Sequence, residues 1–560
     1  MKKTFTLIIV FLMIFHSSAQ LQIHMSTMPV WYITPGIFPT GLGWADIDGN
    51  GYPDVVVSCG LDVGNAPVVV YFNEEGTLPD TAGWISSYTS ANGCLYLGDL
   101  DNDGDPDLAV ASLGITNQGL PLENHEIFYN NNGFPGSPDW LSPLGNGFSC
   151  TGGDVDGDGD LDMVFGQGDW LTSHLQKTKL FINNGGIFDT VPGWETDSSY
   201  YVDEVVFADV DMDGDLDLAI GNERTVVNVG IAIFKNNGGI LETTPSWHTS
   251  SVVGGRQMAF ADSDNDGYLE LALASPTQKF YLFDNKNGVL DTVPCWSSNC
   301  VVTEPSAVAW ADVDGDGDLD LAAGSWFSKV GIFENTGGVL ADTFAWSHGS
   351  GTGTQQLAWN DFDEDWLIDT VKQFQGNGAK KLFYIGKQPI QIISSVEMNG
   401  VPLTLDQYCY DLVDGWISLG FAPSASDILS IEYTFSRDPD LALTNWGQAK
   451  IYENLNGTTG MQDHEPRTSD TRLGPNHPNP LISGTSFPLS VKSPGMVQLN
   501  IYNFQGKRVK ILLNGYISTG EYQITWDGTN ENGTLLPNGI YFCQFIKGSV
   551  TFSEKVIISR

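Results

Sequence analysis

The sequence predicts an all-β protein: a seven-bladed β-propeller, with eight blades as the alternative, followed by a small Ig-like β-sandwich. Three features recur in register: an acidic loop, a Trp ahead of each loop, and an Asn/Gly turn after most loops. Each loop lies between two apolar runs that are too short for helices, so we expect it to join two strands. A unit of about 50 residues with four short strands is typical of a propeller blade.

The acidic loop is the strongest signal. Its seven copies start at intervals of 49 to 55 residues, and in the clearest copy, Asp312 to Asp320, Asp occupies positions 1, 3, 5 and 9. Carboxylates at alternate positions around a Gly turn form an oxygen cage of the kind that suits Ca²⁺. The seven loops hold 32 of the 68 acidic residues. Without cations these carboxylates would repel one another, so we expect Ca²⁺ to belong to the folded state.

The predicted metal ligands are the side chains at positions 1, 3, 5 and 9, enough for about six or seven structural Ca²⁺ ions. They are Asp46, Asp48, Asn50 and Asp54; Asp99, Asp101, Asp103 and Asp107; Asp154, Asp156, Asp158 and Asp162; Asp209, Asp211, Asp213 and Asp217; Asp262, Asp264, Asp266 and Glu270; Asp312, Asp314, Asp316 and Asp320; and Asp361, Asp363, Asp365 and Asp369. The longer Glu270 is expected to alter its cage. Trp366 replaces the Gly of the seventh loop, so either Trp366 takes up the turn or the cage is distorted, and we rank this site weakest.

These repeats resemble the FG-GAP/VCBS-type repeats of integrin α-subunit propellers and of many secreted bacterial proteins. The resemblance covers residues 29–385 and again about 438–457. It implies a propeller with Ca²⁺ in the hairpin loops, but it does not imply a single activity. One Trp per unit predicts packing between blades. Trp170, Trp326 and Trp446 lie off that position and are candidates for an exposed ligand face.

One segment interrupts the repeat. Residues 388–435 contain no acidic loop and alternate in the manner of a small β insert. The run from Asp438 to Ala442 then resembles the second half of a repeat. Either an insert interrupts the closing blade, or a degenerate eighth blade has lost its metal; we favour seven blades.

The chain begins with the pattern of a secretory signal peptide. Lys2 and Lys3 precede an apolar run from Leu7 to Phe15, and small residues end at Ala19. No other stretch approaches the length of an apolar membrane span. We therefore predict a signal peptide over 1–19, a propeller over 20–457, a polar linker over 458–472 and a C-terminal domain over 473–560.

The C-terminal domain resembles the type IX secretion C-terminal sorting domain and the related FlgD-like Ig domain. The matching segments are Pro478–Pro480, Tyr502–Lys507, Trp526–Gly528, Pro537–Tyr541 and the last strand, Lys555–Ser559. The resemblance implies export across an outer membrane, with the secretion machinery as a partner, and release or attachment at the cell surface. An ordinary Ig-like module that stays on the chain is the alternative.

The sequence contains no recognised catalytic motif: no His-Glu-x-x-His, no Gly-x-Ser-x-Gly and no phosphate-binding loop. Histidines such as His125 lie in connections and are expected to be solvated. The formal net charge of −43 argues against nucleic acid as a partner. Cys295 and Cys300 are close enough in sequence for a disulfide, which geometry decides.

The function predicted from these features is an exported, calcium-stabilised binding or adhesion module for a glycan or an extracellular protein. A structural component of a surface layer or matrix is the first alternative. A polysaccharide lyase or hydrolase is the second, and it is disfavoured because the whole chain has only 25 Lys and Arg residues for an active face.

Overall fold

The chain divides into two compact units, Met1–Met461 and Gln462–Arg560. The computed structural model describes residues 22–33, 38–60, 64–114, 122–168, 174–222, 230–249, 254–300, 302–349, 353–456, 471–473, 481, 484–491, 495–503, 507–518, 520–531, 533–547 and 550–558. Within these ranges, no helix is long and apolar enough to cross a membrane. The predicted signal peptide, Trp170 and Pro478–Pro480 lie outside them.

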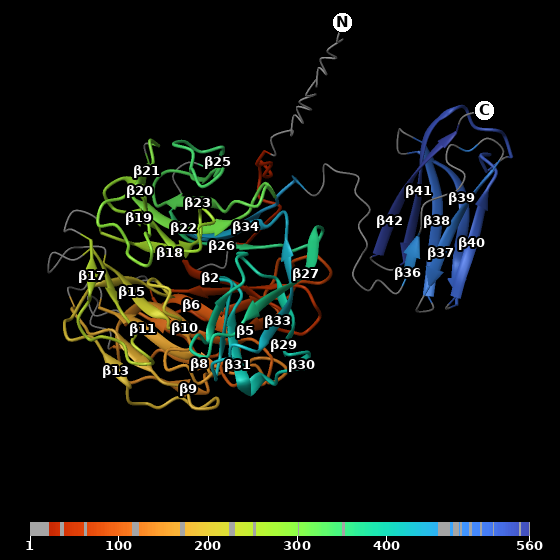
Figure 1. Ribbon diagram of the computed structural model, residues 1–560. Helices are drawn as coiled ribbons and strands as arrows, with labels where there is room; N and C mark the ends of the chain where they lie inside the picture. Colours follow the sequence, from red (N-terminus) through yellow and green to blue (C-terminus); the bar gives the residue numbers. More distant parts are fainter. Residues whose placement is uncertain are drawn as a thin grey trace, which may run out of the picture. The chain divides into compact units, whose positions relative to one another are not determined.

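The first unit contains seven four-stranded antiparallel sheets that follow one another as blades (Figure 1). The innermost strands are β2 (Pro39–Ala45), β6 (Asn92–Gly98), β10 (Gly147–Gly153), β14 (Val202–Ala208), β18 (Gln257–Ala261), β22 (Pro305–Ala311) and β26 (Thr354–Asn360). The second strands are β3 (Asp54–Cys59), β7 (Asp107–Ser112), β11 (Asp162–Gln167), β15 (Asp217–Asn222), β19 (Glu270–Ser275), β23 (Asp320–Ser325) and β34 (Asp440–Asn445).

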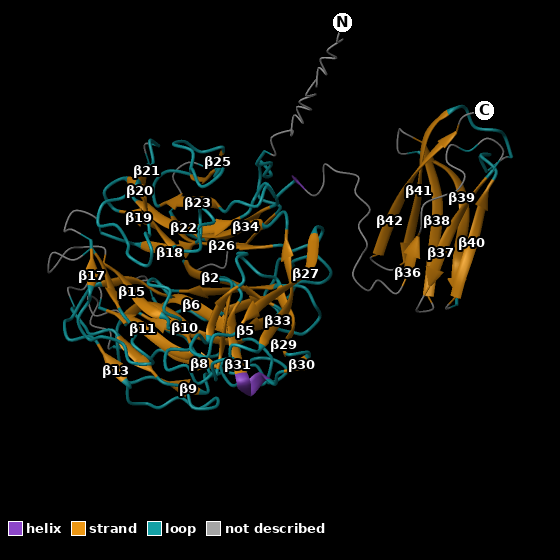
Figure 2. Ribbon diagram, in the orientation of Figure 1, coloured by secondary structure: helices purple, strands orange, loops and turns teal. Residues whose placement is uncertain are grey.

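The two outer positions of each blade hold shorter strands. The third strands are β4 (Val69–Tyr71), β8 (Glu126–Phe128), β12 (Lys179–Phe181), β16 (Ile231–Phe234), β20 (Lys279–Phe283), β24 (Val330–Phe333) and β35 (Gln448–Tyr452). The outermost are β5 (Trp84–Ile85), β9 (Trp140–Leu141), β13 (Trp194–Glu195), β17 (Trp247–His248), β21 (Trp296–Ser297), β25 (Trp346–His348) and β1 (Trp31–Ile33). Strands and the loops between them make up nearly all of the described chain (Figure 2).

The ring is closed by the start of the chain. Strand β1 pairs with β35, with Trp31 opposite Ile451, and so supplies the outer strand of the seventh blade. The innermost strands β26 and β2 are in contact, which joins the last blade to the first. Because β34 and β35 complete this blade, the alternative of a separate eighth blade is wrong and the preferred count of seven is confirmed.

Every outermost strand begins with the repeated Trp, and the ring of each Trp packs on the next blade. The partners are aromatic residues of the third strands, with ring centroids 5.1 to 6.2 Å apart and steep interplanar angles. Trp140, for example, lies 5.1 Å from Phe181 at 75°. The predicted packing between blades is confirmed, and edge-to-face pairs of this kind add to the burial of apolar area.

The segment that interrupts the repeat lies between β26 and β34, inside the acidic loop of the seventh blade. It runs over residues 367–437, which we call the insert, and so it is wider than the predicted 388–435. Its elements are β27 (Leu367–Gln375), β28 (Leu382–Tyr384), β29 (Ile392–Met398), β30 (Val401–Pro402), the 3₁₀ helix η2 (Leu405–Gln407), β31 (Tyr408–Asp411), β32 (Trp416–Leu419) and β33 (Ile428–Ser436). They form two sheets, β27-β33-β29-β30 and β28-β32-β31, over a shared apolar core.

The second unit is a small β-sandwich, which confirms the predicted fold class. Its sheets have the orders β36-β37-β40 and β39-β38-β41-β42. The strands are β36 (Thr471–Leu473), β37 (Thr485–Val491), β38 (Gly495–Asn503), β39 (Arg508–Ile517), β40 (Gly520–Trp526), β41 (Gly539–Lys547) and β42 (Val550–Ile558). Phe487, Leu499, Trp526 and Phe545 are buried between the sheets.

Replacing Trp140 by Ala should destabilise the propeller by about 3 to 5 kcal/mol, the usual cost of removing a large aromatic side chain from a core. Trp140 is buried against Phe165, Phe181 and Phe188. Denaturant unfolding followed by fluorescence measures the change. Leu144→Ala, at a side chain that is 56% exposed, is the control and should leave stability nearly unchanged. Equal effects of the two changes would contradict the packing role.

Candidate metal centres in the blade loops

Each acidic loop connects the innermost strand of a blade to its second strand. Position nine is the first residue of the second strand, as with Asp54 in β3 and Asp320 in β23. Acidic side chains within a loop come together: one carboxylate oxygen of each of Asp46, Asp48 and Asp54 lies within 4.8 Å of the others. Six further groups among the described residues lie as close, including Asp99, Asp101 and Asp107; Asp154, Asp156 and Asp158; Asp209, Asp211 and Asp213; and Asp262, Asp264 and Glu270.

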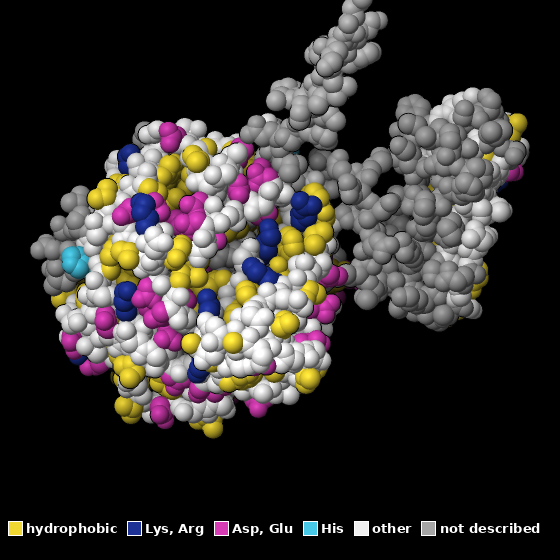
Figure 3. All heavy atoms as spheres, in the orientation of Figure 1, with side chains coloured by type: hydrophobic (Ala, Val, Ile, Leu, Met, Phe, Trp, Pro, Cys, Tyr) yellow, Lys and Arg dark blue, Asp and Glu magenta, His cyan; other side chains and the backbone are white. Residues whose placement is uncertain are grey.

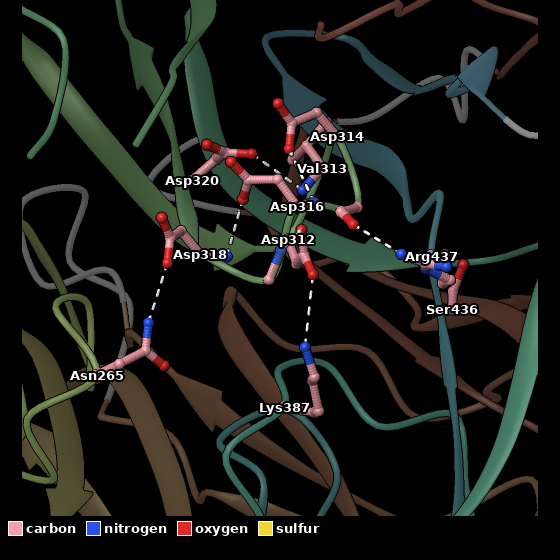
Figure 4. Close-up of polar contacts among 12 residues, drawn as sticks. Asn265, Asp312, Val313, Asp314, Asp316, Asp318, Asp320, Lys387, Ser436 and Arg437 are labelled. Carbon is pink, nitrogen blue, oxygen red and sulfur yellow. Dashed lines mark hydrogen bonds and ion pairs between the residues drawn. The ribbon is translucent and has the colours of Figure 1, made fainter. Parts of the chain in front are cut away.

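The backbone of each loop folds around these carboxylates, as the sixth loop illustrates (Figure 4). The N–H of Gly317 donates to Asp312 Oδ1 (3.2 Å), and the N–H of Asp316 donates to Asp314 Oδ1 (3.1 Å). The N–H of Asp318 donates to Asp316 Oδ1 (2.9 Å). Positions 1, 3 and 5 are therefore oriented before any ion binds.

Glycine at position six is required by the turn. Gly317 has a φ of +103°, a left-handed value that residues with a Cβ rarely adopt. The equivalent glycines of the first five loops have φ between +93° and +103°. Trp366, at position six of the seventh loop, is not left-handed. The expectation that Trp366 takes up the turn is therefore wrong, because the chain leaves the loop there and enters the insert.

The position-nine acid ties the loop to its own blade. One oxygen accepts the N–H of position two at 2.8 to 3.2 Å, from Ile47, Leu100, Val155, Val210, Ser263, Val313 and Phe362. In six blades the other oxygen accepts an Asn N–H at 2.6 to 2.8 Å, from Asn73, Asn130, Asn183, Asn236, Asn335 and Asn454. Each of these Asn residues follows the third strand of its blade.

The same Asn also joins neighbouring blades. Its side-chain Nδ2 donates to the position-two carbonyl of the preceding blade, at 2.7 to 2.8 Å in all seven blades. The pairs are Asn73 to Phe362, Asn130 to Ile47, Asn183 to Leu100, Asn236 to Val155, Asn285 to Val210, Asn335 to Ser263 and Asn454 to Val313. The sequence predicted a turn at these Asn residues and missed the bond between blades.

Several oxygens of the predicted ligands are buried and have no hydrogen-bond partner. They are Asp101 Oδ1, Asp209 Oδ1, Asp211 Oδ1, Asp262 Oδ1, Glu270 Oε1 and Asp361 Oδ1. A buried oxygen without a partner loses its hydration with no compensation, which costs about 1 to 3 kcal/mol or more for a charged group. A hard divalent cation in each loop would satisfy these oxygens, so the residues present fit Ca²⁺.

Burial also raises the pKa of the loop carboxyls. The pKa of Asp99 rises to about 6, those of Asp154 and Asp209 to about 7, and those of Asp107 and Asp217 to about 8. Neighbouring carboxylates in the same loop raise these pKa values further. The ionised loop is therefore costly without a positive charge beside it.

In the seventh blade the structure corrects the assignment of position nine. Asp369 lies in β27 of the insert, paired with Thr434, whose hydroxyl donates to Asp369 Oδ1 at 2.7 Å. Asp440 takes position nine: it begins β34 and accepts the N–H groups of Phe362 (3.2 Å) and Asn454 (2.7 Å). The insert separates the two halves of the loop, so counting along the sequence chose the wrong residue.

Glu270 replaces Asp at position nine of the fifth loop without displacing the strand. It begins β19, and its Oε2 accepts both the N–H and the hydroxyl of Ser263 at 2.9 Å.

Two smaller expectations, on the cysteines and on His125, are settled as well. Cys295 and Cys300 are not joined by a disulfide. His125 is buried rather than solvated, stacks on Phe165 at 4.4 Å and accepts the Ser112 N–H.

The insert lies over the face of the propeller that carries the acidic loops. Its contacts with the third, fourth and sixth loops are Lys381 Nζ to Gly157 O (2.5 Å), Ser418 Oγ to Asp154 Oδ2 (2.7 Å), Asp209 N to Tyr384 OH (3.0 Å), Arg437 Nη2 to Gly315 O (2.8 Å) and the ion pair of Lys387 with Asp312 (3.5 Å). Figure 4 shows Lys387 and Arg437 at the sixth loop. In Figure 3, Lys and Arg side chains lie among acidic ones on the face in view.

The insert also crosses the centre of the ring. The hydroxyl of Tyr96, in β6 of the second blade, donates to Asp411 Oδ2 at 3.1 Å. Gln388 Nε2 donates to the carbonyl of Phe260, in β18 of the fifth blade, at 3.4 Å. Innermost strands of the second and fifth blades lie on different sides of a seven-bladed ring, so the insert covers the axis on the loop face.

The opposite face carries an aromatic cluster. Trp326 and Phe327 follow β23, and Trp446 follows β34, so all three lie at the strand ends remote from the acidic loops. Phe327 and Trp446 are 48% and 41% exposed, with ring centroids 5.0 Å apart. The guanidinium carbon of Arg256 lies 3.8 Å from the centroid of the Trp326 ring, and Arg256 is paired with Glu304 at 2.6 Å.

Comparison with known families finds two matches that agree with this topology. Residues 46–110 and 264–323 match the FG-GAP-like repeat, and residues 484–544 match the FlgD Ig-like domain. The first match includes the first, second and sixth acidic loops and most of the fifth. The propeller is similar to FG-GAP repeats. The second match falls on the small β-sandwich. No curated protein matches the chain.

Solved structures with a similar arrangement share little sequence with this chain. Two crystal structures of BBS1N in complex with ARL6DN, soaked with lead or with mercury, are each 10% identical. The first covers 78% of this chain and 97% of its own at a TM-score of 0.44, the second 77% and 97% at 0.42. The computationally designed Ika8 protein is 10% identical over 75% of this chain and 98% of its own, at 0.38. The fold assignment therefore rests on the sheet topology described above.

Without cations, the propeller should lose stability as pH rises from about 4 to about 8. Folded carboxyls such as Asp107 and Asp217 keep their protons up to about pH 8, whereas unfolded Asp ionises near pH 4. The native state then binds more protons than the unfolded state across this window, so the free energy of unfolding falls with rising pH.

Thermal melts in EDTA between pH 5 and 8 test this expectation. The melting temperature should fall, by about 2 to 4 °C or less for each kcal/mol lost in a domain of this size. Parallel melts in excess Ca²⁺ are the control and should show a much smaller fall. A melting temperature in EDTA that stays level or rises with pH would contradict the electrostatic argument.

Proposed function

We propose that the protein is an exported binding module in which Ca²⁺ holds the blade loops rigid and the face opposite the loops binds a glycan. The single observation that carries the choice of face is the placement of the insert. It covers the axis and part of the loop face, and among the described residues no comparable unit covers the far strand ends, where Trp326, Phe327 and Trp446 lie.

The calcium part of the proposal is supported by unpartnered buried oxygens in several loops. In the first six blades, positions 1, 3, 5 and 9 would hold the ion. In the seventh, Asp440 replaces Asp369 in that set. The bound cation supplies positive charge, which keeps the carboxylates ionised and the hairpins rigid. Because the carboxylates are ordered only in the folded chain, the binding free energy adds to folding stability.

The chemistry of the aromatic cluster favours a sugar ligand. Flat aromatic rings stack on the apolar C–H faces of pyranose rings, and Trp326, Phe327 and Trp446 present such rings from two adjacent blades. Beside them the Glu304 side chain, which is 36% exposed and is paired with the buried Arg256, offers a carboxylate that can accept hydrogen bonds from hydroxyl groups. Trp and Arg are also frequent anchors in protein interfaces, so an extracellular protein is the competing ligand.

Export is the part of the proposal that rests on the chain ends. The pattern of residues 1–19 favours secretion, and the FlgD Ig-like match over 484–544 supports a β-sandwich of the kind seen in type IX sorting domains. We propose that this domain directs passage through the outer membrane to the cell surface or the medium. Millimolar extracellular Ca²⁺ would then be available to loops of modest affinity.

Adding Ca²⁺ to the EDTA-treated protein at pH 7.5 should raise its melting temperature by at least about 5 °C, which needs only a few kcal/mol of linked binding energy. Metal analysis after equilibrium dialysis against millimolar Ca²⁺ should find about six or seven bound ions per chain, one for each loop, as expected if every cage is filled. Mg²⁺ at the same concentration is the control and should shift the melt less. If the melting temperature does not change and no metal is bound, the calcium part of the proposal is wrong.

Binding to a glycan array in Ca²⁺ should be lost when the aromatic cluster is removed. Trp326→Ala and Trp446→Ala should each weaken binding at least about 10-fold, the factor that corresponds to 1.4 kcal/mol. Tyr32→Ala, at an aromatic residue that is 59% exposed outside the cluster, is the matched control. Binding only to proteins would redirect the proposal to an adhesion partner. No ligand, together with self-association on adding Ca²⁺, would favour a structural matrix component.

A further inference from the structure

In the seventh blade, the insert divides the acidic loop into two short segments. Asp361, Asp363 and Asp365 precede the insert, and Asp438 and Asp440 follow it. Counting back from Asp440 at position nine, Asp438 takes position seven. The carboxylates around this centre therefore come from both ends of the insert.

Asp438 is placed differently from the position-seven residues of other loops. In the sixth loop, Asp318 turns toward neighbouring loops: it accepts Asn265 Nδ2 (3.0 Å) and the Gly337 N–H (2.5 Å), and the first of these contacts is drawn in Figure 4. In the third loop, Asp160 likewise accepts hydrogen bonds from Asn102 and Gly185. Asp438 is only 1% exposed, and its Oδ1 lies 3.2 Å from the hydroxyl of Ser436, which also reaches Asp361. Position seven thus adds an inward carboxylate in this blade.

Two oxygens of this centre are buried and unpartnered. Asp361 is 0% exposed and Asp438 is 1% exposed, and neither Asp361 Oδ1 nor Asp438 Oδ2 has a hydrogen-bond partner. The hydroxyl of Ser436 lies 2.9 Å from Asp361 Oδ2 and 3.2 Å from Asp438 Oδ1. Because one hydroxyl reaches both carboxylates, they lie side by side, and each keeps one oxygen for another partner.

We propose that Asp361, Asp363, Asp365, Asp438 and Asp440 form a split Ca²⁺ site that fastens the two ends of the insert to the propeller. This inference rests on the proposed binding of Ca²⁺ by the blade loops. Affinity for Ca²⁺ rises with the number of charged ligands. The split site, with five carboxylates, is therefore the tightest of the seven, although the sequence alone ranked it weakest.

The absence of a Gly at position six does not harm this site. The chain has no sharp turn to make, because it continues into β27 and returns through β33. The base of the insert is closed by the Arg437 N–H, which donates to the Trp366 carbonyl at 3.0 Å. Asp365 immediately precedes Trp366 and Asp438 immediately follows Arg437, so an ion held by both carboxylates reinforces this closure.

The test compares two Asp→Asn variants of the full chain. Bound ions are counted over a series of fixed free Ca²⁺ concentrations for the wild type, Asp438→Asn and Asp369→Asn. Asp438→Asn should bind one ion fewer than the wild type, and the missing ion should be the one that binds at the lowest Ca²⁺ concentration. Asp369→Asn is the matched control, since Asp369 lies on β27 outside the centre, and should bind as the wild type does.

Hydrogen exchange supplies a second measurement. In saturating Ca²⁺, amides of residues 367–437 should exchange at least about 10-fold faster in Asp438→Asn than in the wild type or in Asp369→Asn, because the insert opens locally more often when its two ends are not held by the ion. Exchange in the first four blades should not change. If Asp438→Asn does not fold, Ser436→Ala keeps all five carboxylates and should weaken the tightest binding step by about 10- to 100-fold.

The outcomes separate the two proposals. If the wild type binds six or more ions, and neither Asp438→Asn nor Ser436→Ala changes their number, their affinities or the exchange of the insert, the split site is overturned and calcium in the other loops stands. If the wild type binds no cation, the proposed role of Ca²⁺ fails together with this inference.

Discussion

The propeller depends on one carboxylate in each blade, the acid at position nine. Two backbone N–H groups hold this carboxylate in six blades, one from its own loop and one from the Asn after the third strand. The side chain of that Asn reaches the loop of the preceding blade, and the seven bonds of this type form a closed ring. The same acid and Asn therefore fix the conformation of the loop, the geometry of the blade and the contact with the preceding blade. A change in one of these would disturb the other two.

This arrangement has an electrostatic cost. The position-nine acid is buried beside the carboxylates at positions 1 and 3, and burial raises its pKa, for example to about 7 in Asp54 and to about 8 in Asp107. Hydrogen bonds from the backbone leave further oxygens without partners, such as Asp209 Oδ1 and Asp262 Oδ1. A divalent cation is the simplest partner that both offsets the repulsion and satisfies these oxygens. The residues that hold the blades together are therefore also the residues that would bind the ion.

Repetition made most of this architecture predictable. The period of the repeat predicted the blades, and the recurring Trp predicted the packing between neighbouring blades. The sequence did not reveal that the Asn after the third strand bonds to the preceding loop, because spacing along one unit carries no information about its neighbour. It also placed position nine at Asp369 rather than Asp440, because the pattern assumes a continuous loop. The sequence did match Asp438–Ala442 to the second half of a repeat, and the pairing of Asn360 with Asp440 shows that the seventh blade resumes there.

The position of the insert explains how the two faces of the propeller come to differ. The ends of a hairpin are adjacent, so a folded unit can leave and return there without disturbing the sheet. In this chain the insert interrupts the acidic loop of the seventh blade and therefore lies over other acidic loops and the axis. There Ser418, Lys387 and Arg437 contact those loops. The third, fourth and sixth loops thus gain contacts with the insert, whereas Asp48 and Asp264 of the first and fifth loops stay exposed. Among the described residues, no folded unit of this kind covers the strand ends on the other face, so their side chains can diverge from blade to blade. The aromatic cluster at Trp326 and Trp446 is such a divergence: it departs from the repeat, and its rings pack together across the sixth and seventh blades.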